Sequence, residues 1–278
     1  MTLPTAQGPI GVFDSGYGGL TILNAIRRQL PKYDYLYLGD NARAPYGPRS
    51  FDLVYEFTRQ SVQRLFELGC HLVILACNTA SAKALRTIQQ HDLPGWDPQR
   101  RVLGIIRPTA EVIGSLTTSR HVGLLATEGT VKSLSYTLEI QKQCPDIKVT
   151  GVACPLWVPL VENNEASSPG ADYFVKKRID QLMQQDALID AVILGCTHYP
   201  LLMPKIRRYM PDGVLIVAQG DYVAASLKDY LQRHPAIDDR CSKQGTTRFL
   251  TTENVSRFKE QAQVFLGEQD IAVEKIVL

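Results

Sequence analysis

Two cysteines have neighbours that suit acid–base chemistry. Cys77 precedes an Asn-Thr pair, Cys196 precedes a Thr-His pair, and each follows a short apolar, β-branched segment. If each segment is a buried strand and a helix follows, the thiol lies at a helix N-terminus, where unpaired backbone N–H groups and the helix dipole lower the pKa of a thiol. An ordinary thiol is only a few per cent thiolate at neutral pH, so this help matters. We predict that Cys77 and Cys196 are reactive thiols.

The remaining cysteines lack such polar company. Free cysteine is among the most buried residue types and then acts as a small apolar side chain. We interpret four thiols as structural: Cys70, Cys144, Cys154 and Cys241. Zinc is not expected, because the Cys196–His198 pair has no C-x-x-C partner and the other histidines are scattered without the spacing of zinc ligands. We predict that the protein binds no metal.

A glycine-rich segment follows the first apolar run. Residues 14–19 read Asp-Ser-Gly-Tyr-Gly-Gly, which matches neither the Walker phosphate loop nor the dinucleotide fingerprint. Glycines there still let backbone amides approach an anion at a helix start, which suits carboxylate binding. A tight turn capped by Asp14 is the alternative. A second polar segment, 40–47, also follows an apolar run and would line the same cleft, although alone it would be an ordinary loop.

Apolar runs alternate with amphipathic stretches along the whole chain. Residues 51–68 have a helical period with Leu53, Val54, Phe57, Val62 and Leu65 on one side, and 221–232 has another. Strand–helix alternation at this spacing predicts an α/β fold with parallel sheets covered by helices on both faces. The expected buried strands are 10–13, 35–38, 72–76, 102–105, 122–125, 149–153, 191–194, 215–218 and 247–250, with a closing strand near 271–277.

A weak internal repeat predicts two similar halves. Residues 10–16 can be aligned with 122–128, and 73–79 with 192–198, which brings Cys77 and Cys196 to the same position. We therefore expect two pseudo-symmetric parallel-sheet α/β domains that face each other across a cleft, where open α/β sheets bind their ligands. The first domain would comprise 1–105 plus about 220–278, and the second about 106–219.

Composition excludes several classes of protein. The 278 residues are 45% hydrophobic and 21% charged with a formal charge of +2, which gives no electrostatic footprint for nucleic acid. The chain contains no apolar run long enough to cross a bilayer, and residues 1–9 lack the features of a secretory signal. Six cysteines without an export signal favour reduced thiols and a cytoplasmic location.

Five ordered motifs span essentially the whole chain: Asp14-Ser15-Gly-x-Gly-Gly-Leu20, Pro45-Tyr46-Gly47, Ala76-Cys77-Asn78-Thr79-Ala80, Cys154-Pro155-Leu156-x-x-Pro159-Leu160-Val161-Glu162 and Gly195-Cys196-Thr197-His198-Tyr199-Pro200-Leu201. These motifs resemble those of glutamate racemase, within the aspartate/glutamate racemase family. Departures from the commonest pattern occur at Tyr17, Trp157 and Gln219, the last where aspartate is frequent. They leave the chemistry intact but bear on cavity shape and subunit packing.

The resemblance implies racemisation by two thiols. Cys77 would remove the α-proton of one enantiomer and Cys196 that of the other, one acting as thiolate base while the other is the thiol acid. Asp14 would assist the first cysteine and His198 the second. Asp40 and Glu162 match auxiliary carboxylates near the site, although a structural role for either is an equal alternative. Substrate-contacting positions are matched by Asp14, Ser15, Tyr46, Gly47, Asn78, Thr79, Thr127, Thr130, Thr197 and His198.

The same resemblance implies a biological setting. The enzyme would be a bacterial, cytoplasmic homodimer that needs neither pyridoxal phosphate nor metal, and its D-glutamate would serve peptidoglycan synthesis in the cell wall and hence cell shape. Two alternatives are an aspartate racemase, which usually carries Glu at the position of His198, and a non-catalytic protein that binds an acidic amino acid. A protein-interaction role is typical of relatives with an N-terminal extension, and nine residues precede Ile10 here.

Overall fold

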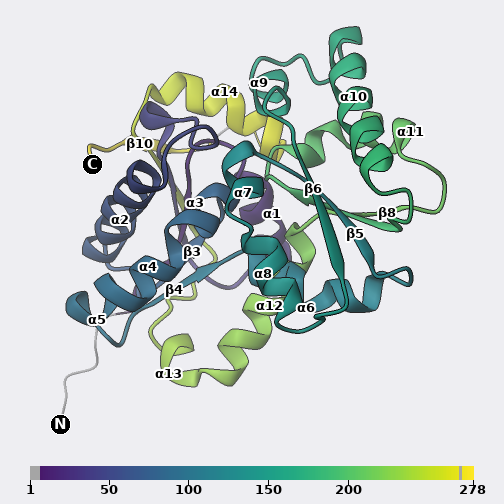
Figure 1. Ribbon diagram of the computed structural model, residues 1–278. Helices are drawn as coiled ribbons and strands as arrows, with labels where there is room; N and C mark the ends of the chain where they lie inside the picture. Colours follow the sequence, from purple (N-terminus) through teal and green to yellow (C-terminus); the bar gives the residue numbers. More distant parts are fainter. Residues whose placement is uncertain (1–6, 269–270) are drawn as a thin grey trace.

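The chain folds around two separate sheets. The structure is a computed structural model that describes residues 7–268 and 271–278; the predicted first domain thus has eight residues, 1–6 and 269–270, outside the described part. Every strand pair in both sheets is parallel. In Figure 1, the first sheet lies on the left, where β3 (Leu72–Leu75) and β4 (Arg101–Gly104) are labelled. The second sheet lies on the right, where β5 (His121–Ala126), β6 (Lys148–Ala153) and β8 (Leu215–Val217) are labelled.

The first sheet has six strands, which come from both ends of the chain. The closing strand expected near 271–277 is present as a short edge strand beside the strand expected at 247–250. In spatial order the strands are β10 (Val273–Lys275), β9 (Thr247–Thr251), β2 (Tyr35–Gly39), β1 (Ile10–Asp14), β3 (Leu72–Leu75) and β4 (Arg101–Gly104).

The second sheet repeats the arrangement of the first. Its order is β6 (Lys148–Ala153), β5 (His121–Ala126), β7 (Ala191–Gly195) and β8 (Leu215–Val217). In both halves the first strand is flanked by the second and third, and the fourth follows the third. The expected α/β fold of two pseudo-symmetric parallel-sheet units is confirmed, and the aligned segments prove to be β1 with β5 and β3 with β7.

The chain crosses between the sheets twice. It leaves β4 for β5 through α6 (Ile106–Leu116), and it leaves β8 for β9 through α12 (Gly220–Arg233) and α13 (Pro235–Asp238). The predicted domain limits near 105 and 220 fall at the start of these two crossings. They stay a prediction, because α12 packs mainly on α1 (Leu20–Gln29) of the first half and also on α6. No helix in residues 7–268 and 271–278 is long and apolar enough to cross a membrane.

Helices cover both faces of the sheets. Residues 51–68 and 221–232 are helical as expected, as α2 and α12. The helices are α1 (Leu20–Gln29), α2 (Phe51–Glu67), α3 (Asn78–Lys83), α4 (Leu85–Thr87), α5 (Leu93–Trp96), α6 (Ile106–Leu116), α7 (Glu128–Lys132), α8 (Ser135–Gln141), α9 (Trp157–Glu162), α10 (Pro169–Gln185), α11 (Met203–Tyr209), α12 (Gly220–Arg233), α13 (Pro235–Asp238) and α14 (Val255–Leu266), with 3-10 helices η1 (Asn41–Arg43) and η3 (Tyr199–Leu202) and the π-helical turn η2 (Ile88–Asp92).

Helix α2 illustrates how the local sequence sets an element. The side chain of Ser50 caps the helix by accepting a hydrogen bond from the backbone N–H of Leu53. Val54 and Val62 are fully buried, as predicted. Leu53, however, is 43% exposed, so the prediction that it lies on the same side of the helix as these buried residues was wrong. One residue on an α-helix is about 100° of rotation, so with Val54 turned to the core its neighbour lies at the edge of the apolar stripe.

The burial of both sheet faces follows the period of a strand. Along β1, Ile10 and Val12 pack in one apolar cluster with helix α1, whereas Phe13 belongs to a second cluster with helix α2. Alternate residues thus face opposite sides, and both sides are apolar, as expected for a parallel sheet between helical layers. The polar residues that follow β1, β3, β5 and β7, among them Ser15, Asn78 and Thr127, lie at the carboxyl ends of these parallel strands and thus at one edge of each sheet.

Candidate active site

Cys77 lies between the first sheet and a short helix. It follows β3 and is the N-cap residue of α3, where its sulfur accepts a hydrogen bond from the backbone N–H of Ala80 at 3.5 Å. The hydroxyl of Ser15, which follows β1, is 3.4 Å from the same sulfur. The placement of Cys77 at a helix N-terminus is therefore as expected, and the structure brings two of the predicted site residues into contact.

Cys196 occupies the equivalent place after β7 but has different partners. Its sulfur lies 3.8 Å from Nδ1 of His198, and Nε2 of that ring lies 2.9 Å from a carboxylate oxygen of Glu162. This series of thiol, imidazole and carboxylate resembles the geometry in which a base is oriented by a third group. The expected α-helix does not begin here: η3 intervenes and α11 starts only at Met203.

Burial decides the ionisation of both thiols. Each cysteine is only 6% exposed. Burial, reinforced by the charge of Asp14, raises the pKa of Cys77 to about 11 against the opposing hydrogen bonds from Ser15 and Ala80. Burial raises the pKa of Cys196 well above its ordinary value, with only the backbone N–H of His198 opposing. The expectation of lowered pKa values was wrong, because desolvation of the thiolate outweighs the helix terminus.

Asp14 is a buried carboxylate with one free oxygen. Oδ1 accepts a hydrogen bond from the backbone N–H of Gly16 at 2.8 Å, whereas Oδ2 has no hydrogen-bond partner among the described residues. Burial raises the pKa of Asp14, and the Coulombic interaction of Asp14 with His198 opposes this shift. An unpartnered buried carboxylate oxygen is costly unless a ligand or a proton satisfies it. Asp14 is therefore suited to hold a cationic group or a proton beside Cys77.

The glycine-rich segment brings the two thiol environments together. A Cβ atom on Gly18 would lie 2.3 Å from the hydroxyl of Thr197 and 2.4 Å from Nδ1 of His198, and one on Gly19 would lie 2.5 Å from Cβ of Asp14. Only glycine permits such close approach. Gly18 thus allows the segment to contact the second half, and the backbone N–H of Gly16 donates to Asp14. Carboxylate binding by this segment stays a prediction.

Three threonine hydroxyls link the halves. The hydroxyl oxygen of Thr79 on α3 is 2.9 Å from that of Thr127 and 3.4 Å from that of Thr130, and the latter two are 3.0 Å apart. Thr127 also caps α7 through the backbone N–H of Thr130. These three predicted binding residues, from β3–α3 and β5–α7, form one cluster of neutral hydrogen-bonding groups.

Asp40 holds the loop that carries Tyr46. Its carboxylate is fully buried and accepts hydrogen bonds from the phenol of Tyr46, from Nε of Arg43 at 2.6 Å and from the hydroxyl of Thr252 at 3.0 Å. With its oxygens occupied in this way, Asp40 supports the loop, and none of its contacts reaches either thiol. The backbone carbonyl of Gly47 in the same loop accepts the N–H of Gly129, at 3.0 Å, from the other half.

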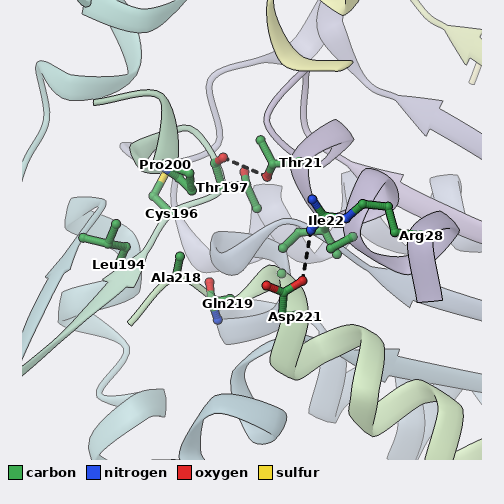
Figure 2. A pocket seen from close by; sticks show the side chains of 12 residues that line it. Thr21, Ile22, Arg28, Leu194, Cys196, Thr197, Pro200, Ala218, Gln219 and Asp221 are labelled. Carbon is green, nitrogen blue, oxygen red and sulfur yellow. Dashed lines mark hydrogen bonds and ion pairs between the residues drawn. The ribbon is translucent and has the colours of Figure 1, made fainter. Parts of the chain in front are cut away.

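A cavity of about 160 Å³ reaches Cys196 from the side of α1 and α12 (Figure 2). Thr21 donates a hydrogen bond to the carbonyl of Thr197 at 3.0 Å on one wall, and the Arg28–Asp221 ion pair, 3.0 Å long, lies on another. Gln219 is also part of the lining, whereas Cys77 is not.

Sequence reasoning missed several residues of this region as contributors. Gln219, noted only as a departure from a common aspartate, donates and accepts hydrogen bonds beside Asn78, together with Tyr136. Tyr17 packs on Phe258 with ring centroids 5.6 Å apart, and Trp157 contacts the ring of Tyr199 at 4.8 Å. No sequence motif pointed to Tyr136, because its position relative to Asn78 depends on the packing of the two halves.

The remaining cysteines are free thiols. Cys70, Cys154 and Cys241 are buried, and Cys144 is partly exposed. Within residues 7–268 and 271–278, no group of three or more His, Cys, Asp or Glu side chains is arranged to hold a metal ion. The prediction that the protein uses no metal or cofactor stays a prediction.

Known proteins are similar to this chain in both sequence and fold. The model of the family described as Asp/Glu/Hydantoin racemase matches residues 10–227. A glutamate racemase of Roseobacter denitrificans is 40% identical over 268 residues, which cover 92% of this chain and 96% of that protein. The crystal structure of a glutamate racemase isoform from Bacillus anthracis has a TM-score of 0.89 at 35% identity, covering 98% of each chain. The glutamate racemase of Francisella tularensis, solved with D-glutamate, has a TM-score of 0.86 at 30% identity and covers 99% of this chain and 98% of that one.

Proposed function

Because the chain belongs to the Asp/Glu/hydantoin racemase family, we propose that it interconverts L-glutamate and D-glutamate with Cys77 and Cys196 as the two acid–base groups. As a member of that family it is an isomerase. The observation that carries the proposal is the equivalence of the two thiols: each is buried at the end of the third strand of its half, and each has its own polar partner.

Racemisation requires a proton to leave one face of the α-carbon and another to arrive on the opposite face. Two related half-sites facing one substrate supply both groups without turning the substrate over. In one direction the Cys77 thiolate takes the α-proton and becomes a thiol, while the Cys196 thiol gives its proton to the opposite face and becomes a thiolate. The reverse direction exchanges the two roles.

The raised thiol pKa values mean that the protein alone keeps both thiols protonated at neutral pH. Substrate must therefore help to form the thiolate. The ammonium group of an amino acid would supply the positive charge, and the free Oδ2 atom of Asp14 is a fitting acceptor for that ammonium group or for the thiol proton. Charge development on the α-carbon then occurs in a site from which water is largely excluded, where fixed polar groups act strongly.

His198 and Glu162 would assist the second thiol. The imidazole lies between the sulfur and the carboxylate, so the hydrogen bond to Glu162 orients the ring. With Nε2 donating to Glu162, Nδ1 faces the Cys196 sulfur at 3.8 Å, where it would accept or return the thiol proton. This geometry favours Glu162 as a positioning residue, one of the two roles that the sequence left open.

Hydroxyl and amide groups would bind the carboxylates of the substrate. Ser15, Asn78, Thr79, Thr127, Thr130 and Thr197 carry neutral groups that would donate to these carboxylates. The phenol O–H of Tyr46, predicted as a further donor, is already donated to Asp40. We propose glutamate over aspartate, since a site built for the longer acid leaves its polar groups unpaired when the shorter one binds. The aspartate racemase and the non-catalytic binding protein are the alternatives that the first experiment tests.

Circular dichroism of the purified protein with L-glutamate, and separately with D-glutamate, tests the proposed reaction. The signal of either enantiomer should decay to zero, because the equilibrium constant between enantiomers is unity. L- and D-aspartate under the same conditions should change at least about tenfold more slowly. Equal or faster turnover of aspartate would point to the aspartate racemase, and no turnover of either acid would leave only the binding protein.

Isotope incorporation tests the use of two separate thiols. When protiated L-glutamate reacts in deuterated water, D-glutamate formed in the first turnovers should carry deuterium, because the second thiol has exchanged with solvent beforehand. The unreacted L-glutamate should stay protiated at early times. A single base would return the same hydrogen to the other face, so largely protiated early product, measured by proton NMR, would exclude the two-thiol assignment.

We propose further that the D-glutamate serves peptidoglycan synthesis in a bacterial cytoplasm and that the enzyme is a homodimer. The similarity to bacterial glutamate racemases supports this setting. Expression in a bacterium that requires D-glutamate should restore growth and cell shape, and the Cys77→Ala variant should not. Light scattering of the purified protein should give twice the 31.0 kDa chain mass; a mass of one chain would contradict the dimer.

A further inference from the structure

Asn78, Tyr136 and Gln219 form a closed ring of hydrogen bonds beside the thiols. The phenol of Tyr136 donates to Oδ1 of Asn78 at 2.7 Å, and Nδ2 of Asn78 donates to Oε1 of Gln219 at 2.7 Å. Nε2 of Gln219 donates to the phenol oxygen of Tyr136 at 2.6 Å, which closes the ring. All three residues are at most 3% exposed, so a broken bond would leave buried polar atoms unpaired.

A backbone carbonyl fixes the direction of every bond in this ring. The carbonyl oxygen of Ile105 can only accept, and it lies 3.1 Å from Nε2 of Gln219. That atom must therefore be the amide nitrogen, so Oε1 must accept from Asn78. Asn78 then presents Oδ1 to the phenol, which must donate there and accept from Gln219. Burial raises the pKa of Tyr136 well above its ordinary value, so the phenol keeps the proton that this arrangement needs.

The ring joins residues of both halves, and its Gln219 is also hydrogen-bonded to Ile105. Asn78 begins α3 of the first half, and Tyr136 lies on α8 of the second. Ile105 is at the first crossing, just before α6, and Gln219 is at the second, just before α12. The hydroxyl of Thr109 on α6 also lies 3.2 Å from Nε2 of Gln219 but outside the ring. The orientation of the Asn78 amide therefore depends on how the two halves pack against each other.

The amide of Asn78 is hydrogen-bonded to a residue that lines the cavity at Cys196. Asn78 directly follows Cys77, and Gln219 shares the wall of one cavity with Cys196 (Figure 2). With one N–H of Asn78 donated to Gln219, its second N–H has no hydrogen-bond partner among the described residues. Nδ2 is therefore a fixed donor with one free N–H, which is the complement of a carboxylate oxygen.

We propose that Gln219 and Tyr136 are positioning residues that act through Asn78, holding its amide so that it offers a donor to a substrate carboxylate next to Cys77. This proposal rests on the proposed racemase function. Because every member of the ring is neutral, it orients the amide without placing a charge near either thiol.

A double-mutant cycle tests the ring. Tyr136→Phe removes a single oxygen atom and Gln219→Ala removes the amide; each should lower kcat/KM for L-glutamate about 10- to 100-fold. In the background of Asn78→Ala, the same changes should cost less than about twofold, because their effect passes through Asn78. The matched control is Thr109→Val, which removes the outer contact of Gln219 but leaves the ring intact, and should keep kcat/KM within about twofold. Losses that add in the double variants would overturn the proposal.

A readout independent of turnover separates the ring from the proposed reaction. In nitrogen-15 NMR spectra of the full chain, the side-chain amide protons of Gln219 and the bonded amide proton of Asn78 should exchange slowly with solvent. Tyr136→Phe should accelerate that exchange, while Thr109→Val should not accelerate the exchange of Asn78. Freely exchanging amides in the unmodified protein would refute the ring even if glutamate is racemised. Absence of racemisation with protected amides would refute the proposed function and leave the ring standing as a feature of the fold.

Discussion

At the residue scale, Cys77 and Cys196 stand at equivalent strand ends but have unlike partners, so neither can replace the other. We expect Cys77→Ala and Cys196→Ala each to abolish racemisation in both directions, because each thiol is the base one way and the acid the other. Cys70→Ala and Cys241→Ala, which remove buried thiols that make no contact with the site, are the matched controls and should keep turnover. Rates from L- and D-glutamate decide the matter; a single thiol variant with near-normal turnover in either direction would contradict the pairing.

The raised thiol pKa values predict how activity depends on pH. A pKa of about 11 for Cys77, and a raised value for Cys196, leave the thiolate scarce near neutrality. Below the pKa the thiolate fraction rises about tenfold per pH unit, and kcat/KM reports groups of the free enzyme. Log kcat/KM should therefore rise with a slope of about 1 between about pH 7 and pH 9. A plateau already present at pH 7 would mean that a thiolate forms despite its burial.

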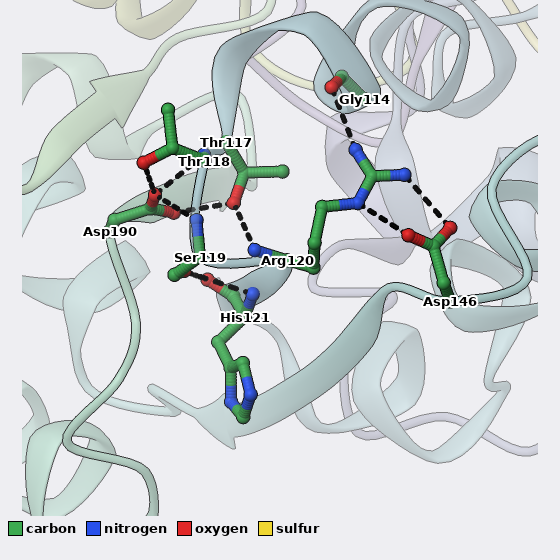
Figure 3. Close-up of polar contacts among 8 residues, drawn as sticks. All are labelled: Gly114, Thr117, Thr118, Ser119, Arg120, His121, Asp146 and Asp190. Atoms are coloured by element: carbon green, nitrogen blue, oxygen red, sulfur yellow. Dashed lines mark hydrogen bonds and ion pairs between the residues drawn. The ribbon is translucent and has the colours of Figure 1, made fainter.

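At the element scale, one carboxylate holds the connection between α6 and β5 (Figure 3). Asp190, just before β7, accepts hydrogen bonds from the backbone N–H groups of Thr118 and Ser119, both at 2.7 Å, and from the hydroxyls of Thr117 and Thr118. Burial alone would raise the pKa of Asp190, but these bonds hold it well below the usual range. The ionised carboxylate therefore stabilises the second sheet where β5 and β7 begin.

Asp190→Asn should lower the free energy of unfolding by about 1–3 kcal/mol at neutral pH, because it replaces an acceptor by a donor facing N–H groups. Folding lowers the pKa of Asp190, so its stabilisation is fully present above the pKa in the unfolded chain, about 4. The stabilisation is lost as pH falls from there through the lower pKa of the folded protein. Urea unfolding at several pH values should show the difference between the two proteins shrinking towards acid pH. Asp146→Asn, which affects only the exposed ion pair with Arg120, is the control and should have a smaller effect. Equal effects of the two changes would contradict this role of Asp190.

At the scale of the whole molecule, the two halves meet through backbone as well as side chains. Helix α7 approaches the loop of Tyr46 so closely that a Cβ on Gly129 would lie 2.6 Å from the carbonyl oxygen of Gly47. A backbone atom cannot turn away as a side chain can, so an added methyl group has to separate the halves. The threonine cluster that joins Thr79 to Thr127 lies next to this contact and would open with it.

Gly129→Ala should therefore destabilise the closed arrangement by about 1–3 kcal/mol and reduce kcat/KM at least about tenfold, with the far-UV circular dichroism of both sheets retained. Gly95→Ala is the matched control, because a Cβ there meets nothing within 4 Å and alanine favours its helix. Steady-state kinetics and thermal unfolding of both variants are the measurements. Full activity in Gly129→Ala would show that the halves need not approach this closely.

The sequence by itself determined the elements and their repetition. Strands such as 10–13 and 191–194 are short apolar runs, and α2 and α12 have a helical period, so a window of a few residues contains the information. The match of the segment before Cys77 with the one before Cys196 likewise needed no structure, because a duplicated fold repeats its local pattern. Parallel strands have their carboxyl ends at the same edge of a sheet. The sequence therefore also determined the edge at which the polar residues after each strand gather.

Only the tertiary structure decided which groups meet and how they ionise. Glu162 contacts His198 across 36 residues, and Gln219 contacts Asn78 across 141, so no local pattern encodes either pair. Local reasoning predicted lowered thiol pKa values from a helix N-terminus; the structure reversed the direction for Cys77 because the surrounding chain excludes water. The desolvation of a thiol depends on every segment packed around it, and these segments come together only when both halves have folded against each other.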